Sequence, residues 1–570
     1  VHEVVGGRPR ETPAPRVAVR DGWEELIEPD QFDRLERAIK SYLTDAVVHY
    51  GKARTVRDVT VRAATRLPIP TPTALVAVNA ELLDGEAQFR AVRLGFAPPE
   101  AAGAIAPAAV VAELTRGGAP AGVLFDARTD PAYSGAFLGA IAANRAVPFD
   151  GGEVVATRFP RFASAIEGDA VPEPITLRRS RQHDLTVTFG TRAVMKSFER
   201  IEAGVHPTVE LGRFLTEQTT YDRAVPVLGA LEFRPADGEP LTMAVLYGFV
   251  PHESTAWQYT LDALSRFYEG VLAHPMNPPP PAPADAWLTD AAPPGEGREL
   301  LNSYLQTAEA LGRDTAALHR TLATGTAPAL APEPFGKLYQ RSVYQGMRTR
   351  IGLVLRGLAR QLPALSDTAR DLARSLLAAE GELTRRCRAV LRPEMTGQRV
   401  RVHGNYHLGE LLYTGSGFVV IDFEGDPERP LSERRIKRSP LRDVADMVRS
   451  FHYAALTPLY GPEDAPGKFS GVIRAEDRRE VLGWARFWAS WAAARFVRAY
   501  FAETAGTGLL PADPAARREL LELFVLEKAV AELGTELDQR PARAAIPMTG
   551  LLDLLGADSP VPAIAKGPPA

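Results

Sequence analysis

Two short motifs in the C-terminal half stand out by the types and the spacing of their polar residues. Residues 403–410 read HGNYHLGE, which is typical of a strand end followed by a turn, and residues 421–427 read IDFEGDP, where Asp422 ends an apolar strand. Carboxylates at such strand ends suit Mg²⁺, and a polar side chain in the turn can orient an acceptor hydroxyl. The pattern predicts Glu410 and Asp422 as metal ligands and Asn405 and Asp422 as catalytic residues in phosphoryl transfer.

Phosphoryl transfer also needs a cation that holds the phosphates of the donor. Lys196 lies in a strand-like run, and Glu210 follows 14 residues later in a helical pattern. An ion pair between them would aim the ammonium group at the phosphates of ATP. The alternative is a surface lysine on an edge strand. The position upstream of the turn motif favours ATP binding by Lys196 and Glu210.

A basic run, ERRIKRSPLR, covers residues 433–442. One interpretation is a solvated helix entry whose cations pair with Asp443 and Asp446. The other is a wall of the acceptor site, in which Arg438 contacts the substrate. Nucleic-acid binding is the weakest interpretation, because the run has no interleaved aromatic residues.

Three further features are interpreted as structural. Trp484, Trp488 and Trp491 share one helix face, which favours packing in the core over stacking on a sugar. His407 is expected to support the turn motif through a hydrogen bond. Cys387 is the single cysteine, cannot form an internal disulfide and is expected to be a packed helix residue in a reducing cytoplasm.

These motifs need elements to hold them, and hydrophobic periodicity divides the chain into two halves. Up to residue 255, short alternating runs predict strands with a few helices; beyond it, long amphipathic patterns predict helices. Expected strands are 74–78, 89–94, 185–189, 192–198, 243–249, 399–403 and 418–423, and expected helices are 23–42, 101–112, 134–145, 256–273, 298–322, 337–362, 366–391, 481–504 and 515–537. The prediction is an α+β, bilobal chain.

The motifs and their surroundings resemble bacterial maltokinases, which belong to the aminoglycoside phosphotransferase-like, protein-kinase-like superfamily. The similarity includes residues 196–217 (KSFERIEAGVHPTVELGRFLTE) and 248–267 (GFVPHESTAWQYTLDALSRF), and loosely extends over residues 31–555. It implies transfer from ATP to maltose, giving maltose 1-phosphate, with Mg²⁺ as a cofactor. Since members are often fused to trehalose synthase, it also implies that enzyme as a partner.

The resemblance implies a domain order along the chain. The expected parts are a flexible tail (1–22), an N-terminal cap-like subdomain (23–145), an intermediate β-rich lobe on the ATP side (146–255), a helical C-lobe with the catalytic and metal loops (256–558) and a second tail (559–570).

Several positions depart from the maltokinase pattern. Asn405 stands where the family has the Asp of HGD, and Glu410 stands where maltokinases usually have Gln. Lys528 matches a sugar-contacting lysine, but Ala531 and Thr535 replace two tyrosines. The loop at 181–186 (RQHDLT) differs from the family's phosphate-covering loop. The departures leave open a pseudokinase that regulates or scaffolds trehalose or glucan enzymes, and a kinase for another sugar such as an aminosugar.

Composition excludes other broad classes. The chain has 570 residues, 45% of them hydrophobic, and a formal net charge of −4, which gives no general attraction to nucleic acid or to anionic membranes. Its first residues lack the apolar core of a secretion signal, and no run of about 18 apolar residues would span a membrane. A cytoplasmic enzyme acting on a small sugar is expected.

Overall fold

The structure is a computed structural model. It describes residues 13–46, 48–49, 52–53, 56–67, 69, 71–83, 87–149, 151–166, 174–179, 184–198, 200–273, 277–283, 285–427, 429–460, 473 and 477–556. The expected tails therefore lie largely outside the described residues, as do positions 181–183 of the divergent loop. The chain forms two compact units: Val1–Pro251 with Glu428–Glu433, and His252–Pro427 with Arg434–Ala570.

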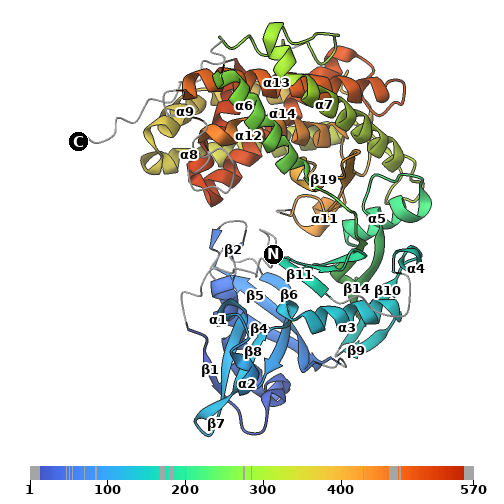
Figure 1. The fold of residues 1–570 in the computed structure, drawn as a ribbon, viewed down its shortest axis with the longest axis vertical. Helices are drawn as coiled ribbons and strands as arrows, with labels where there is room; N and C mark the ends of the chain where they lie inside the picture. The colour runs from blue at the N-terminus through green and yellow to red at the C-terminus, as the bar shows by residue number, and fades with distance from the viewer. Residues whose placement is uncertain are drawn as a thin grey trace. The chain divides into compact units, whose positions relative to one another are not determined.

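The first unit begins with a six-stranded sheet in the order β1-β7-β8-β6-β5-β4. Helix α1 packs on it because Leu35, Ile39 and Leu43 lie on one helix face and are buried (Figure 1). The elements of this part are β1 (Arg16–Ala18), α1 (Phe32–Ala46), β2 (Val48–His49), β3 (Lys52–Ala53), β4 (Val56–Arg66), β5 (Thr73–Leu82), β6 (Ala87–Ala97), α2 (Pro99–Ala102), β7 (Val110–Arg116) and β8 (Ala119–Asp126).

A seven-stranded sheet completes the first unit, in the order β11-β12-β13-β15-β14-β10-β9. Its central strands are almost wholly buried, which fits their continuous apolar sequences. Helix α3 contacts β10, β11 and β14, and α5 contacts β14. The elements are α3 (Pro131–Ala142), β9 (Ala146–Phe149), β10 (Gly152–Arg158), α4 (Phe162–Ala165), β11 (Pro174–Arg179), β12 (Leu185–Phe189), β13 (Ala193–Ser197), α5 (Pro207–Gln218), β14 (Val227–Pro235) and β15 (Leu241–Gly248).

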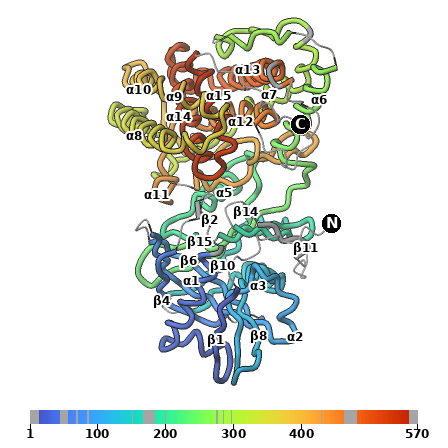
Figure 2. Tube along the Cα trace, turned by 90° about the vertical axis from the view of Figure 1, so that its left-hand side faces the viewer, coloured from blue at the N-terminus to red at the C-terminus, as the bar shows by residue number. Residues whose placement is uncertain are grey.

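The second unit is mainly helical, and α12 contacts α13, α14 and α15 (Figure 2). Trp484, Trp488 and Trp491 are buried in its core, which confirms their interpretation as packing residues. The elements are β16 (Ser254–Thr255), α6 (Ala256–Ala273), α7 (Gly295–Leu322), β17 (Glu333–Pro334), α8 (Lys337–Gln361), α9 (Asp367–Ala378), α10 (Glu380–Cys387), β18 (Gln398–Arg399), β19 (Leu411–Tyr413), β20 (Phe418–Val420), α11 (Leu431–Arg434), α12 (Leu441–Tyr460), α13 (Arg478–Glu503), α14 (Pro514–Gln539) and α15 (Ala545–Leu555).

The predicted α+β class is confirmed, and the helices expected over 256–273, 298–322, 337–362, 481–504 and 515–537 fall close to α6, α7, α8, α13 and α14. The helix expected over 23–42 begins only at Phe32, after two 3-10 turns, and α12 was not predicted. The helix expected over 101–112 is wrong: Gly103 closes the short α2, a 3-10 turn starts at Pro107, and β7 begins at Val110. Alanine content suggested a helix there, but the glycine, the proline and the β-branched Val110 and Val111 oppose one. The helix expected over 366–391 is broken into α9, α10 and a 3-10 turn. Within the described residues no helix is long and apolar enough to cross a membrane.

Candidate phosphotransfer site

The turn that carries Asn405 is fixed by a buried carboxylate. Asp443, near the start of α12, is fully buried and accepts hydrogen bonds from the backbone N–H groups of His403 (2.8 Å) and Gly404 (2.9 Å). Gly404 has φ of 81°, a left-handed conformation that favours glycine. Because Asp443 holds the two residues immediately before Asn405, it sets the path of the backbone into the site.

Two further buried polar side chains, from α7 and α13, hold Asp443 in place. His319 on α7 lies 3.0 Å from Asp443 through Nε2, and its Nδ1 lies 2.8 Å from the hydroxyl of Tyr500 on α13. A carboxylate accepts, so Nε2 carries the proton and Nδ1 accepts from the tyrosine. Burial would raise the pKa of Asp443, but the hydrogen bonds and charge of its partners lower it. Asp443 is therefore an anion at neutral pH.

The two predicted metal ligands flank adjacent strands: Glu410 immediately precedes β19, and Asp422 lies two residues after the end of β20. Leu411 pairs with Val420 in the β19–β20 ladder, and the N–H of Ile421 donates to the carbonyl of Glu410 at 3.0 Å. Asp422 follows immediately, with φ of 66°, which is unusual for a residue other than glycine. Such backbone strain is typical of functional sites, where the surrounding structure enforces it.

His403 ties the two motifs together. Its Nε2 donates to the carbonyl of Ile421 at 2.8 Å, so this nitrogen carries the proton. Burial lowers the pKa of His403, although the charge of Asp443 opposes that shift. A neutral imidazole thus links the turn to the residue that precedes Asp422.

Asn405 contacts Glu410 inside the turn. Its Nδ2 lies 3.4 Å from Oε1 of Glu410, and Nε2 of His407 also lies 3.4 Å from that oxygen. Nδ1 of His407 accepts from the N–H of Gly409 at 3.0 Å, which confirms the expected supporting role of this histidine. An amide cannot act as a base near neutral pH, but its oxygen can still accept a hydrogen bond.

The donor set fits Mg²⁺ bound together with a nucleotide. Mg²⁺ commonly takes one or two protein carboxylates and completes its shell with phosphate oxygens and water. Glu410 and Asp422 supply such oxygens from neighbouring positions. In the described part of the chain, no three His, Cys, Asp or Glu side chains converge on a metal position of their own. A bound Mg²⁺ would supply charge neutralisation for the phosphates.

Lys196 lies on β13 in the first unit and is buried. Its ammonium forms an ion pair with Asp184 at 3.6 Å, and both side chains are about one-tenth exposed. Thr186 on β12 is the strand partner of Lys196, which places Asp184 at the start of that strand. Glu210 lies in the first turn of α5. Its pairing with Lys196 remains a prediction, whereas Asp184 is a partner that sequence reasoning did not foresee.

The basic run does not have the expected solvated pairs with Asp443 and Asp446. Asp443 is buried against the turn, and Asp446 pairs with Lys528. The cations find other partners: Lys437 contacts Glu333 at 2.8 Å, and Arg442 contacts Glu527 at 2.9 Å. Arg438 pairs through its backbone with Val400, shortly before the turn motif. Its contact with a sugar remains a prediction.

Lys528 lies on α14 among acidic groups. Its ammonium is 3.3 Å from Asp446, and the charges of Asp446, Glu532 and Asp426 raise its pKa, although burial lowers it. Burial raises the pKa of Asp446 to about 7, while Lys528 opposes that shift. The charge of Asp426 acts on Lys528 from the segment that follows Asp422. Ala531 and Thr535 lie partly buried on the same helix.

Sequence reasoning missed His319 and the role of Asp443. No local motif marks His319, which is 124 residues from its partner. Asp443 was noticed only as a possible surface counter-ion, because it follows a run of cations. The available signal was its place in the apolar pattern of α12, where Leu441, Val444 and Met447 are all buried.

Comparison with known proteins defines the class to which this arrangement corresponds. Residues 287–425, which include the turn motif and Asp422, match the family described as the phosphotransferase enzyme family. A solved glucosamine kinase in complex with glucosamine, ADP and inorganic phosphate superposes with a TM-score of 0.56 at 17% identity, over 94% of this chain and 100% of that one. A second glucosamine kinase structure, crystal form B, gives a TM-score of 0.57 at 17% identity, over 88% and 94%. The chain therefore shares the aminoglycoside phosphotransferase-like fold of these solved glucosamine kinases.

Among proteins of known activity, two glucosamine kinases are similar at low identity. The glucosamine kinase of Mycolicibacterium smegmatis is 24% identical over 328 residues, which cover 54% of this chain and 68% of that protein. The glucosamine kinase of Streptacidiphilus jiangxiensis is 24% identical over 244 residues, 42% of this chain and 45% of that protein. The resemblance to maltokinases specifically finds no support in these matches.

Proposed function

We propose that the protein is an ATP- and Mg²⁺-dependent kinase that phosphorylates a small sugar, with an aminosugar as its preferred acceptor. The observation that carries the proposal is the joined pair of motifs: Glu410 and Asp422 lie at adjacent positions, while Asp443 and His403 fix the backbone around them. Lys196 would hold the phosphates of ATP, Glu410 and Asp422 the Mg²⁺, and Asn405 the acceptor hydroxyl. Phosphoryl transfer depends mainly on positioning and charge, which these residues supply.

The acidic surroundings of Lys528 support an aminosugar over maltose. Asp446, Glu532 and Asp426 place three carboxylates against the ammonium of Lys528 and the guanidinium of Arg449, which pairs with Glu532 at 2.7 Å. Carboxylates at this position would attract an acceptor that carries a protonated amine. Ala531 and Thr535 provide no aromatic platform for a disaccharide. The glucosamine kinases above agree with this acceptor class.

A second candidate is a pseudokinase that binds nucleotide or sugar and regulates a partner, for which trehalose synthase remains the expectation from sequence. Asn405 favours it, because loss of a general base typically lowers a rate by roughly 10²–10⁴-fold. In this case the turn would keep its architecture and bind ligand without turnover.

One assay separates these candidates. ADP release is measured with ATP, Mg²⁺ and a panel of glucosamine, other aminosugars, glucose and maltose, for the unmodified protein and for Asn405→Asp. Turnover by the unmodified chain, fastest with an aminosugar, is the expected result. A maximum with maltose would overturn the acceptor assignment. Nucleotide binding without turnover in either protein would favour the pseudokinase.

A further inference from the structure

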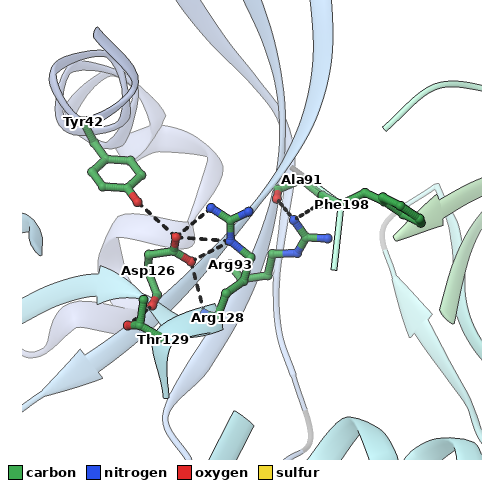
Figure 3. Close-up of polar contacts among 7 residues, drawn as sticks. All are labelled: Tyr42, Ala91, Arg93, Asp126, Arg128, Thr129 and Phe198. Carbon is green, nitrogen blue, oxygen red and sulfur yellow. Dashed lines mark hydrogen bonds and ion pairs between the residues drawn. The ribbon is translucent and has the colours of Figure 1, made fainter. Parts of the chain in front are cut away.

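Arg93 is a buried cation far in sequence from every motif considered so far. It lies on β6 of the six-stranded sheet and is only 2% exposed. Its Nη1 donates to the carbonyls of Ala91 at 2.8 Å and Phe198 at 2.9 Å (Figure 3). Its Nη2 lies 3.3 Å from the carbonyl of Met243. One guanidinium of the N-terminal sheet therefore contacts the backbone of two strands in the second sheet.

The carbonyls of Phe198 and Met243 lie at the end of the β13–β15 ladder, which includes Lys196. Lys196 on β13 pairs with Val245 on β15, Ser197 pairs with Ala244, and the N–H of Phe198 donates to the carbonyl of Met243 at 2.9 Å. Arg93 binds the carbonyls of this last pair, two residues beyond Lys196. A planar guanidinium with several donors in fixed directions can hold two carbonyls at once.

The sheets are also joined by their backbones at this point. An isolated antiparallel bridge links Arg90, on β6, to Arg200. On one edge β6 pairs with β5, over Ala87–Gly95. On the other edge it pairs with β8 only from Leu94 onward. The segment after Lys196 thus lies along the part of β6 that β8 does not cover.

Arg93 lies close to a second set of buried polar groups, among which Asp126 and Arg128 act on it through their charges. Asp126 accepts from the hydroxyl of Tyr42 at 3.0 Å and from Nη2 of Arg128 at 2.7 Å (Figure 3). Burial lowers the pKa of Arg93, but the phenol of Tyr133 and the charge of Asp126 oppose that shift. A charge buried this deeply is costly unless it is hydrogen-bonded, so the bonds of Arg93 to the three carbonyls restrict its guanidinium to one place.

We infer that Arg93 is a positioning residue for the nucleotide lysine. By binding the carbonyls of Phe198 and Met243, it fixes the end of β13. It thereby fixes the position of the Lys196 ammonium group relative to the phosphates of ATP. The six-stranded N-terminal sheet then contributes to nucleotide binding through Arg93. The inference rests on the proposed function in one respect, the assignment of Lys196 to ATP.

The test compares Arg93→Met, Arg93→Lys and the control Arg128→Met in the full chain. Arg128 is a second buried arginine of the first unit, and its guanidinium hydrogen-bonds the carboxylate of Asp126. Calorimetry gives the dissociation constant for MgADP and MgATP, and thermal unfolding gives the folded fraction. Hydrogen exchange reports the amides of residues 193–198 and 241–245 in the absence of ligand.

Arg93→Met is expected to weaken nucleotide binding by about tenfold to 100-fold, with faster exchange confined to those two segments. Arg93→Lys, which keeps the charge but cannot hold both carbonyls, should fall between it and the unmodified chain. Arg128→Met should lower the unfolding temperature and leave the nucleotide affinity of the folded protein unchanged. Equal nucleotide affinity in Arg93→Met and the unmodified protein would overturn the inference.

Failure of the proposed function gives a different result. If the unmodified chain binds no nucleotide, the ATP assignment of Lys196 is wrong, and the exchange data then decide the structural claim alone. Faster exchange confined to 193–198 and 241–245 in Arg93→Met would still support positioning of β13 by Arg93. Unchanged exchange there, or an equal increase in Arg128→Met, would refute it.

Discussion

Asp443→Asn tests whether a single buried carboxylate holds the catalytic turn. Oδ2 of Asp443 accepts from the N–H of His403 and from Nε2 of His319, and Oδ1 accepts from the N–H of Gly404. The isosteric amide can keep its oxygen at the first position. Its NH₂ group then faces the N–H of Gly404, so one bond becomes a contact between two donors.

The expected loss follows from that geometry. An unsatisfied buried donor costs about 1–3 kcal/mol, and the two remaining bonds lose their charge assistance. A total of about 2–3 kcal/mol corresponds to a drop of about 4–12 °C in the unfolding temperature of a unit of this size. Since Gly404 directly precedes Asn405, turnover or ligand affinity of the folded variant should fall as well.

Urea and thermal unfolding followed by circular dichroism measure the first effect, and the ADP-release assay measures the second. Asp371→Asn is the matched control, because Asp371 is more than half exposed and pairs with Arg374 on the same helix. Its change should stay within about 0.5 kcal/mol. If Asp443→Asn is as stable and as active as this control, the turn is held by something else.

Two further predictions concern charged groups elsewhere. Burial lowers the pKa of His452 below 6.5, and Arg449 donates to its Nδ1, so the folded protein binds a proton there less readily than the unfolded chain. Below pH 6.5 the free energy of unfolding should therefore fall by up to about 1.4 kcal/mol per pH unit relative to the variant His452→Gln. If urea unfolding gives both proteins the same dependence on pH between pH 7 and pH 5.5, the prediction is wrong. Asp184→Asn removes the carboxylate beside Lys196 and should tighten MgATP binding by calorimetry while lowering the unfolding temperature, and weaker binding would show that Asp184 supports the nucleotide.

Much of the architecture could be predicted because its signals are local. The helix that contains Leu35 has an apolar face at the helical period, and β15, which pairs with the strand of Lys196, is mostly apolar in sequence. The turn motif and Asp422 also lie close together in sequence, so their pairing on adjacent strands follows from one short hairpin. Local patterns of this kind survive even where individual functional residues have changed.

The parts that could not be predicted depend on long-range contacts. His319 and Asp443 meet because α7 and α12 both pack against α13, and Arg93 reaches Phe198 across 105 residues. A buried arginine or aspartate is also indistinguishable from a surface one in sequence, since its type favours solvent in general. Asp184 was noted only as a departure in a divergent loop, and its pairing with Lys196 needed the register of β12 on β13.

The departure at Asn405 is best understood together with Glu410. The resemblance to maltokinases places an aspartate at the first position and usually a glutamine at the second, whereas this chain has an amide followed by a carboxylate. The number of charges is the same, and the two side chains touch at 3.4 Å. Asn405 donates to Glu410, so the exchanged pair is internally compatible.

This compatibility predicts that restoring the aspartate alone is an incomplete repair. Asn405→Asp would set two carboxylates about 3.4 Å apart, a repulsion of about 5 kcal/mol at an effective dielectric constant of 20. Metal binding would offset it only in part. Asn405→Asp with Glu410→Gln recreates one carboxylate and one amide in the opposite order. In the ADP-release assay the double variant should exceed the unmodified chain by roughly 10²–10⁴-fold and should also exceed the single variant. If the single variant is equal or faster, Glu410 is not electrostatically coupled to position 405; if both are slower than the unmodified chain, the exchanged order is itself the functional arrangement.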